Sequence, residues 1–246
     1  GLGYSVTFVI YLREPGSYLQ SLFLENIKHG CGDEFGSAAR QTLERGSYSF
    51  SDWVFQFDYD LIARQMARVA GARVVFRSFE HLIDGSIVPD FLALIGHASP
   101  GGKVAAKVEA NVQTDPATLL RQFVRNRHAA HFPDVGHIVE VLDMLVGERQ
   151  LVPTMPGRLG EVIARERSSK IKQALDQQSA VAPSIRRPRS GGWDVNISRL
   201  FSWETQVEAM AIYDQAPGSG DDKLAALRSG DQGVFENWRN WVAAGL

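Results

Sequence analysis

The pattern of apolar and polar residues changes sharply within the first thirty positions of the chain. Residues 6–12 read Val-Thr-Phe-Val-Ile-Tyr-Leu, a run of β-branched and aromatic residues that predicts a buried strand. A Pro-Gly turn follows, and apolar residues then recur at helical spacing as far as Ile27. Ser17 and Gln20 have the spacing of a capping box and Gly30 is a typical stop, so we expect a helix between them.

Similar patterns predict the elements that follow. Residues 31–57 are expected to form a polar loop that contains at most a short helix. We expect a helix over 58–70, a strand over 73–79, and helices over 89–95, 135–145, 157–178, 197–213 and 234–243. A further helix is expected to begin at Pro116, with Asp115 as its N-cap. Residues 179–196 and 215–233 are expected to be a basic loop and a turn-rich stretch.

The order strand, helix, strand, helix in the first half favours right-handed crossovers and a parallel sheet. The predicted fold class is therefore α/β, with helices flanking a parallel sheet and a largely helical C-terminal half. We expect residues 1–150 to form the α/β core and residues 151–246 to form a helical extension of the same domain.

The junction between the first strand and the first helix carries the candidate chemistry. Arg13 stands at the carboxyl end of the strand, and Ser21 follows eight positions later on the helix. A helix N-terminus offers free N–H groups and positive partial charge, and a guanidinium adds a planar cation that suits phosphate. We predict an anion site at Arg13 and Ser21. The alternative is an ordinary strand–turn–helix with a surface arginine.

This arrangement resembles the 3′-phosphate-binding motif of the sulfotransferases, which use 3′-phosphoadenosine 5′-phosphosulfate (PAPS) as sulfuryl donor. Four later segments, at 58–62, 74–82, 85–96 and 111–127, are similar to segments of the bacterial members, so the likeness covers roughly residues 5–130. The resemblance implies a P-loop-NTPase-like fold and a nucleotide whose 3′-phosphate contacts Arg13 and Ser21. It requires no metal.

The resemblance also implies two further cofactor contacts. Phe79 stands where the family places an aromatic ring near the adenine, although an ordinary core phenylalanine is an equally simple interpretation. Arg187 lies in the basic, glycine-containing segment 186–193, which resembles a late loop that touches the 3′-phosphate; the alternative is a solvated basic loop. For Glu80 the resemblance implies a structural hydrogen bond.

The resemblance fails upstream of the arginine strand. Family members carry there a Lys-Gly-Thr-like loop that grips the 5′-phosphosulfate, and usually the catalytic base. This chain contains no such loop. Either the N-terminal part is missing from the chain, or the protein has lost the catalytic half of its site. We predict no catalytic residue for the same reason.

Three functions follow as expectations. The first is sulfuryl transfer from PAPS to a hydroxyl or amine acceptor, such as a carbohydrate. The alternative is a non-catalytic sulfotransferase-like module that binds a nucleotide or a partner, and a nucleotide kinase of related architecture is a third interpretation.

The composition of the chain narrows the range of expected binding partners. Of the 246 residues, 44% are hydrophobic and 22% charged, as is usual for a soluble globular protein. The net charge of −2 argues against a general nucleic-acid binder or a membrane-surface protein, and no apolar run is long enough to span a bilayer. Because Cys31 is the single cysteine, an intrachain disulfide is excluded and a cytoplasmic location is expected.

Two remaining clusters have modest interpretations. The histidines at 128, 131 and 137 lack the framework of a zinc site, so we expect no metal. Trp238 and Trp241 lie on a predicted helix and either pack into the core or form a partner surface, so oligomerisation stays open.

Overall fold

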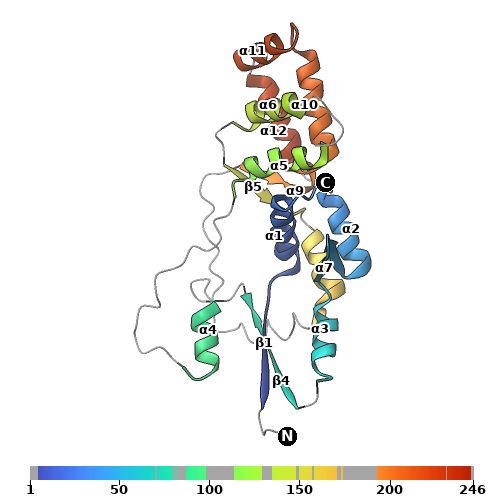
Figure 1. Cartoon of the computed structure of the whole chain (residues 1–246), viewed down its shortest axis with the longest axis vertical. Helices are drawn as coiled ribbons and strands as arrows, with labels where there is room; N and C mark the ends of the chain where they lie inside the picture. Colours follow the sequence, from blue (N-terminus) through green and yellow to red (C-terminus); the bar gives the residue numbers. More distant parts are fainter. Residues whose placement is uncertain are drawn as a thin grey trace.

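The chain forms a mixed α/β structure in which helices predominate (Figure 1). This computed structural model describes residues 5–69, 71–79, 82, 87–97, 114–128, 135–147, 150–156, 158–170, 173, 193–230 and 232–244. The strands are β1 (Val6–Leu12), β2 (Ser47–Phe50), β3 (Trp53–Gln56), β4 (Ala72–Ser78), β5 (Leu151–Thr154) and β6 (Trp193–Asn196). The predicted α/β class is confirmed at this level.

Helices account for most of the remaining described residues. They are α1 (Pro15–Lys28), α2 (Phe35–Arg45), α3 (Tyr59–Met66), α4 (Ile87–Leu94), α5 (Pro116–His128), α6 (Val135–Val146), α7 (Leu159–Arg167), α9 (Ile197–Leu200), α10 (Trp203–Gln215), α11 (Asp221–Ser229) and α12 (Gln232–Ala243).

Strands β1 and β4 pair in parallel, as predicted, with Val6 opposite Ala72 and Leu12 opposite Ser78. A small apolar cluster packs on one face of this pair, where Leu12 of β1 and Tyr59 of α3 are buried. The described residues give β1 and β4 no further strand partners. The larger P-loop-like sheet that the resemblance implies is therefore not confirmed.

Helix α1 begins three residues earlier than the capping-box prediction. Its N-cap is Glu14, whose carboxylate accepts from the backbone N–H groups of Gly16 (2.9 Å) and Ser17 (2.6 Å). Gln20 turns away from this cap and donates to the carbonyl of Pro153 (2.6 Å). The Ser17–Gln20 capping box is thus wrong, because the carboxylate of Glu14 satisfies the first N–H groups instead.

The segment predicted as a polar loop is mostly ordered secondary structure. It contains α2 and an antiparallel hairpin in which Tyr48 of β2 pairs with Phe55 of β3. Tyr48 is 2% exposed, so the hairpin contributes to the core. The turn between the strands passes through Ser51 at φ 51°, a left-handed conformation that the sequence does not announce with glycine.

The second half is largely helical, as predicted, but it also contains a parallel pair of short strands. Leu151 of β5 lies opposite Trp193 of β6, where the sequence pattern indicated loop. The helix expected over 197–213 is broken at Phe201 into α9 and α10. Helix α11 lies in the stretch expected to be turns, and Leu224 is its buried residue.

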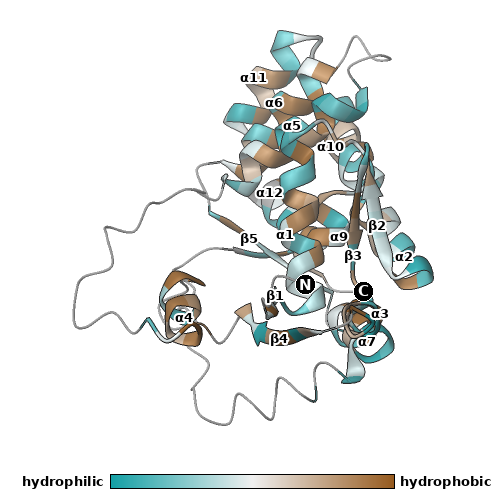
Figure 2. Ribbon diagram, turned by 60° about the horizontal axis from the view of Figure 1, so that its bottom comes forward, coloured by the Kyte–Doolittle hydropathy of each residue, from teal (hydrophilic) through white to brown (hydrophobic). Residues whose placement is uncertain are grey.

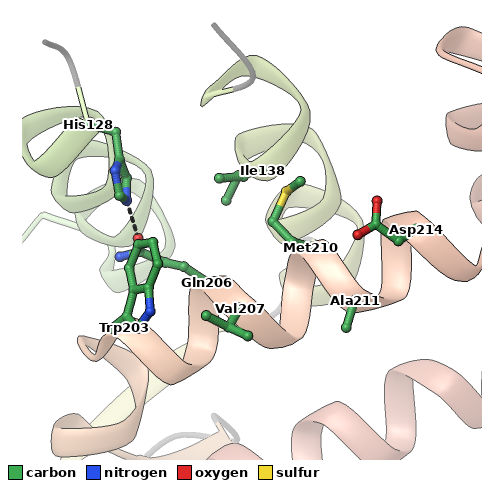
Figure 3. A pocket seen from close by; sticks show the side chains of 8 residues that line it. All are labelled: His128, Ile138, Trp203, Gln206, Val207, Met210, Ala211 and Asp214. Atoms are coloured by element: carbon green, nitrogen blue, oxygen red, sulfur yellow. Dashed lines mark hydrogen bonds between the residues drawn. The ribbon is translucent and has the colours of Figure 1, made fainter. Parts of the chain in front are cut away.

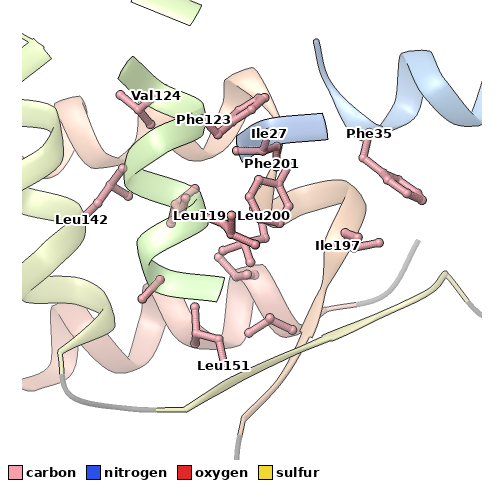
Figure 4. Packing of buried hydrophobic residues seen from close by; sticks show 14 of the residues in the cluster. Ile27, Phe35, Leu119, Phe123, Val124, Leu142, Leu151, Ile197, Leu200 and Phe201 are labelled. Carbon is pink, nitrogen blue, oxygen red and sulfur yellow. The ribbon is translucent and has the colours of Figure 1, made fainter. Parts of the chain in front are cut away.

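One large hydrophobic core joins the helices of both halves with β5 and β6 (Figure 4). Phe123 of α5 and Phe201 meet edge to face with ring centroids 5.5 Å apart, and Phe23 of α1 packs on Phe201 in the same way at 5.7 Å. Trp238 is 2% exposed and belongs to this core, and Trp241 packs against it. Figure 2 shows apolar stretches on the helices of this core and also on α4.

The helices that form the large core are called the helical layer below. Helix α1 connects this layer to the β1–β4 pair. In Figure 1 its C-terminal end points toward α5 and α9, and its N-terminal end points toward β1. At that end α1 crosses α7 very closely: a Cβ placed on Gly16 would lie 2.7 Å from the Cα of Gly160. This crossing fixes where α1 begins, and hence where the residues just before it lie.

Candidate functional site

Arg13 and Ser21 meet at the carboxyl end of β1. The Nη1 atom of Arg13 donates to the Oγ of Ser21 at 3.1 Å. Arg13 directly follows the strand, and Ser21 lies at the end of the second turn of α1 rather than in its first. Because Ser21 accepts from Arg13, its own O–H remains able to donate to a ligand. The contact is open to solvent.

Phe79 is brought to the same place by the pairing of the strands. Leu12 and Ser78 are the last paired residues of β1 and β4, so Arg13 and Phe79 are the next residues on each strand. The guanidinium carbon of Arg13 lies 5.0 Å from the centre of the Phe79 ring. Such a contact favours a fixed position for the cation. The Phe79 ring therefore contacts Arg13 itself and helps to hold its guanidinium in place.

The charge of Arg13 is not neutralised by a carboxylate of the described residues, whereas three other partly buried arginines have an acidic partner. Arg77 pairs with Asp90, Arg121 with Asp143 at 2.8 Å, and Arg127 with Glu34 at 3.0 Å. Within that same part of the chain, the buried Nε of Arg13 also has no hydrogen-bond partner. A guanidinium with donors to spare and no counter-ion is suited to an added anion.

The N-terminus of α1 does not provide the free N–H groups that the sequence suggested. The carboxylate of Glu14 already accepts from two of them. An anion at this junction therefore cannot rely on the first turn of the helix, and this part of the prediction is wrong. The available donors belong to the side chains of Arg13 and Ser21.

Tyr18 is a neighbour of Arg13 that the sequence patterns did not single out. Its ring packs against Phe57 with centroids 4.9 Å apart. Burial raises the pKa of the Tyr18 hydroxyl, and the nearby charge of Arg13 opposes that rise. Tyr18 stands three positions before Ser21, so helical spacing puts both on one side of α1. That spacing was the signal that could have identified it.

A second polar cluster fixes α4 to the same strands. Tyr11 and Arg77 are opposite each other in the β1–β4 register, and both bind Asp90 of α4. The Tyr11 hydroxyl donates at 2.8 Å, and Arg77 Nε donates at 3.0 Å. Residues Tyr11 and Arg13 are two apart, so strand alternation places this cluster beside the Arg13 site.

The protonation of this cluster follows from its contacts. Hydrogen bonding to Arg77 lowers the pKa of Asp90, against the opposing effect of burial. Burial and the hydrogen bond to Asp90 raise the pKa of Tyr11 to about 12. Asp90 is therefore a carboxylate at neutral pH, and it is already engaged by Arg77 and Tyr11.

The remaining candidates either are not described by the structure or have contacts elsewhere. Arg187 and Glu80 lie outside the described residues, as does His131. His128 is buried and bonded to Gln206, and His137 stacks on Tyr213 with ring centroids 5.0 Å apart. Cys31 is buried 3.7 Å from the hydroxyl of Tyr48, and burial raises its thiol pKa.

The described residues contain neither a candidate metal site nor a candidate membrane-spanning helix. No group of three or more histidine, cysteine, aspartate or glutamate side chains there could hold a metal ion. No helix in that part of the chain combines the length and the apolar character needed to cross a bilayer.

Comparisons with protein-family models, with curated proteins and with solved structures gave no match to this chain.

Proposed function

We propose that the chain binds the 3′-phosphate of an adenosine nucleotide at Arg13 and Ser21. In this proposal the protein is a sulfotransferase that transfers a sulfuryl group from PAPS to a hydroxyl or amine acceptor. The observation that carries the proposal is the 3.1 Å contact between Arg13 Nη1 and Ser21 Oγ. It joins the two side chains that the motif pairs across eight positions of sequence.

The chemistry of these residues supports phosphate over other anions. A guanidinium presents parallel N–H donors that match two phosphate oxygens, and the Ser21 hydroxyl adds a third donor to the same group. Phe79 holds the guanidinium, and Asp90 is engaged by Arg77 and Tyr11 instead of competing for it. The site therefore offers its ligand a guanidinium that no carboxylate of the described residues pairs with.

In the proposed reaction these residues anchor the donor and take no part in bond making. The acceptor oxygen or nitrogen forms a bond to sulfur as the bond from sulfur to the 5′-phosphate oxygen breaks, and the acceptor loses its proton. Adenosine 3′,5′-bisphosphate is left. Anchoring contributes by holding the reactants in line, which lowers the entropic part of the barrier.

A second candidate is a non-catalytic nucleotide-binding module. Two features favour it: the contacts at the site join Arg13, Ser21 and Phe79, none of which is a usual general base, and the sequence contains no Lys-Gly-Thr-like phosphosulfate loop. Incubation with PAPS and candidate acceptors separates the two. Acceptor-dependent release of adenosine 3′,5′-bisphosphate supports the enzyme, and nucleotide binding without release supports the module.

The binding proposal is tested by the preference for adenosine 3′,5′-bisphosphate over adenosine 5′-monophosphate, measured by calorimetry. The wild type should prefer the bisphosphate because only this ligand has a 3′-phosphate. Arg13→Gln should lose about 1.5–3 kcal/mol of bisphosphate binding, roughly 10- to 150-fold, and leave the monophosphate unchanged.

Arg73→Gln is the matched control, because Arg73 is an exposed arginine at the amino end of β4 in the same strand pair. It should keep the full preference of the wild type. An equal preference for the bisphosphate in Arg13→Gln and in the wild type would contradict the proposal.

A further inference from the structure

A groove lies on the helical layer, remote from the Arg13 site. It has a volume of about 370 Å³ and is lined mainly by apolar side chains of α6 and α10 (Figure 3). In Figure 1 these helices are at the opposite end of the molecule from β1 and β4. The volume lies within the range of small-molecule sites.

A buried amide gives the groove a specific polar character. Gln206 lines the groove and is fully buried, with its Oε1 accepting from the Nε2 of His128, itself 4% exposed. This bond requires a proton on His128 Nε2. The other end of the amide, Nε2, is buried and has no hydrogen-bond partner among the described residues.

An unpaired amide donor in an apolar setting is costly, by about 1–3 kcal/mol. Reversing the amide, with His128 in its other tautomer, would pair the nitrogen with His128 and leave the oxygen unpaired instead, so one buried end of the amide stays unpaired in either orientation. In the orientation of the structure, a ligand that brings one acceptor oxygen to Gln206 Nε2 would remove the cost. In that orientation the groove favours a carbonyl over a donor group.

The rim of the groove contains an aromatic side chain and an aliphatic one, both partly exposed. Trp203 is 41% exposed, and its ring lies 5.3 Å from that of His128 and 5.8 Å from the guanidinium of Arg127. Val207 beside it is 47% exposed. Gln206 Nε2 is closed to solvent, so binding of a ligand there requires a shift of a lining side chain, and the half-exposed indole of Trp203 is the nearest one at the rim.

We propose that this groove binds a small neutral molecule that has an apolar body and one carbonyl oxygen. The apolar body lies on Met210, Val207 and Ile138, and the carbonyl accepts from Gln206 Nε2. This site is independent of nucleotide binding at Arg13.

The test uses a matched pair of probes, 4-phenylbutan-2-one and protonated 4-phenylbutan-2-amine, in which a carbonyl is exchanged for an ammonium group. Binding is followed by NMR through the Gln206 side-chain amide and the Trp203 indole N–H. The ketone should bind saturably and shift both signals. The amine should not, because its donors face another donor.

Gln206→Glu keeps an oxygen for His128 and removes the N–H donors. It should weaken ketone binding by about tenfold and create affinity for the amine. Gln215→Glu makes the same change at an exposed position of the same helix and should leave ketone binding unchanged. Val207→Trp, on the exposed rim, should obstruct the groove for the ketone without disturbing the core.

Three results would overturn the proposal. They are absence of saturable ketone binding, equal ketone affinity in the wild type and in Gln206→Glu, and a concentration-dependent dimer that occupies the groove in place of the ketone. The last result would make the groove an interface between two copies of the chain. Nucleotide affinity should not change in any of these variants.

Discussion

Arg13 and Arg77 lie near the carboxyl ends of adjacent strands, and their neighbours give them different roles. Arg77 is paired with Asp90 and is thereby committed to holding α4. Arg13 is held by the hydroxyl of Ser21 and the ring of Phe79, neither of which cancels its charge. A positive charge held without neutralisation is the simplest requirement of an anion site.

The ion pair of Asp90 predicts a loss of stability in acid. Its pKa is lowered in the folded protein, so the unfolded chain takes up this proton first as the pH falls. The stabilisation is present above the usual aspartate pKa of about 4 and disappears as the pH drops through the folded value. Near neutral pH the free energy of unfolding of the wild type should be larger than that of Asp90→Asn by about 1–2 kcal/mol. This difference should disappear in acid.

The measurement is urea unfolding of both proteins across the acidic range. Asp52→Asn is the control for removing a negative charge, since Asp52 is exposed in the turn between β2 and β3. A difference between wild type and Asp90→Asn that stays constant with pH would show that Asp90 does not act through its charge.

The sequence predicted part of the site for identifiable reasons. Arg13 and Ser21 belong to a strand end and a helix, and both elements were strongly patterned. Glu14 was missed because the serine–glutamine capping box looked sufficient, and the competition between two possible caps is decided by three-dimensional packing. Tyr18 was missed because its closeness to Arg13 depends on the angle between β1 and α1.

At the scale of elements, the strands that the sequence missed are short and weakly marked. The β2–β3 turn places Ser51 at positive φ, where the sequence offers no glycine signal. Strand β5 contains Pro153 and is four residues long, and its partner β6 is distant in sequence. Such pairings are stabilised by tertiary contacts that no local pattern encodes. Strands β1 and β4 were recognisable because each is a seven-residue run rich in β-branched and aromatic residues.

The crossing of α1 and α7 predicts a strong effect of one methyl group. A Cβ on Gly16 would lie 2.7 Å from the backbone of Gly160, which cannot move as a flexible side chain could. Gly16→Ala should therefore destabilise the protein by about 1–3 kcal/mol, because α1 must shift away from α7. The free energy of unfolding in urea measures this effect.

Gly36→Ala is the matched control at another helix start. Gly36 lies in the first turn of α2, and a Cβ there meets no atom within 4 Å. Its replacement should be neutral or stabilising by up to about 1 kcal/mol. Equal stability changes in the two variants would show that the α1–α7 contact is not tight. Because α1 also carries Ser21, Gly16→Ala should weaken nucleotide binding as well.

At the scale of the whole molecule, α1 is the structural link between the core and the proposed anion site. Its buried face, which includes Leu19, Phe23 and Ile27, belongs to the large core, and Ser21 stands on its exposed side. The order of elements predicted the parallel pairing of β1 with β4. It could not predict how the helical layer packs on α1, because that packing depends on contacts between residues far apart in sequence.

The central claim is that Arg13 and Ser21 act on one phosphate group, and a double-mutant cycle tests it most directly. Calorimetry would measure adenosine 3′,5′-bisphosphate binding to wild type, Arg13→Gln, Ser21→Ala and the double variant. Two groups that share one phosphate and one hydrogen bond should be coupled by about 0.5–3 kcal/mol. Strictly additive losses, or variants that bind the bisphosphate as tightly as wild type, would contradict the claim.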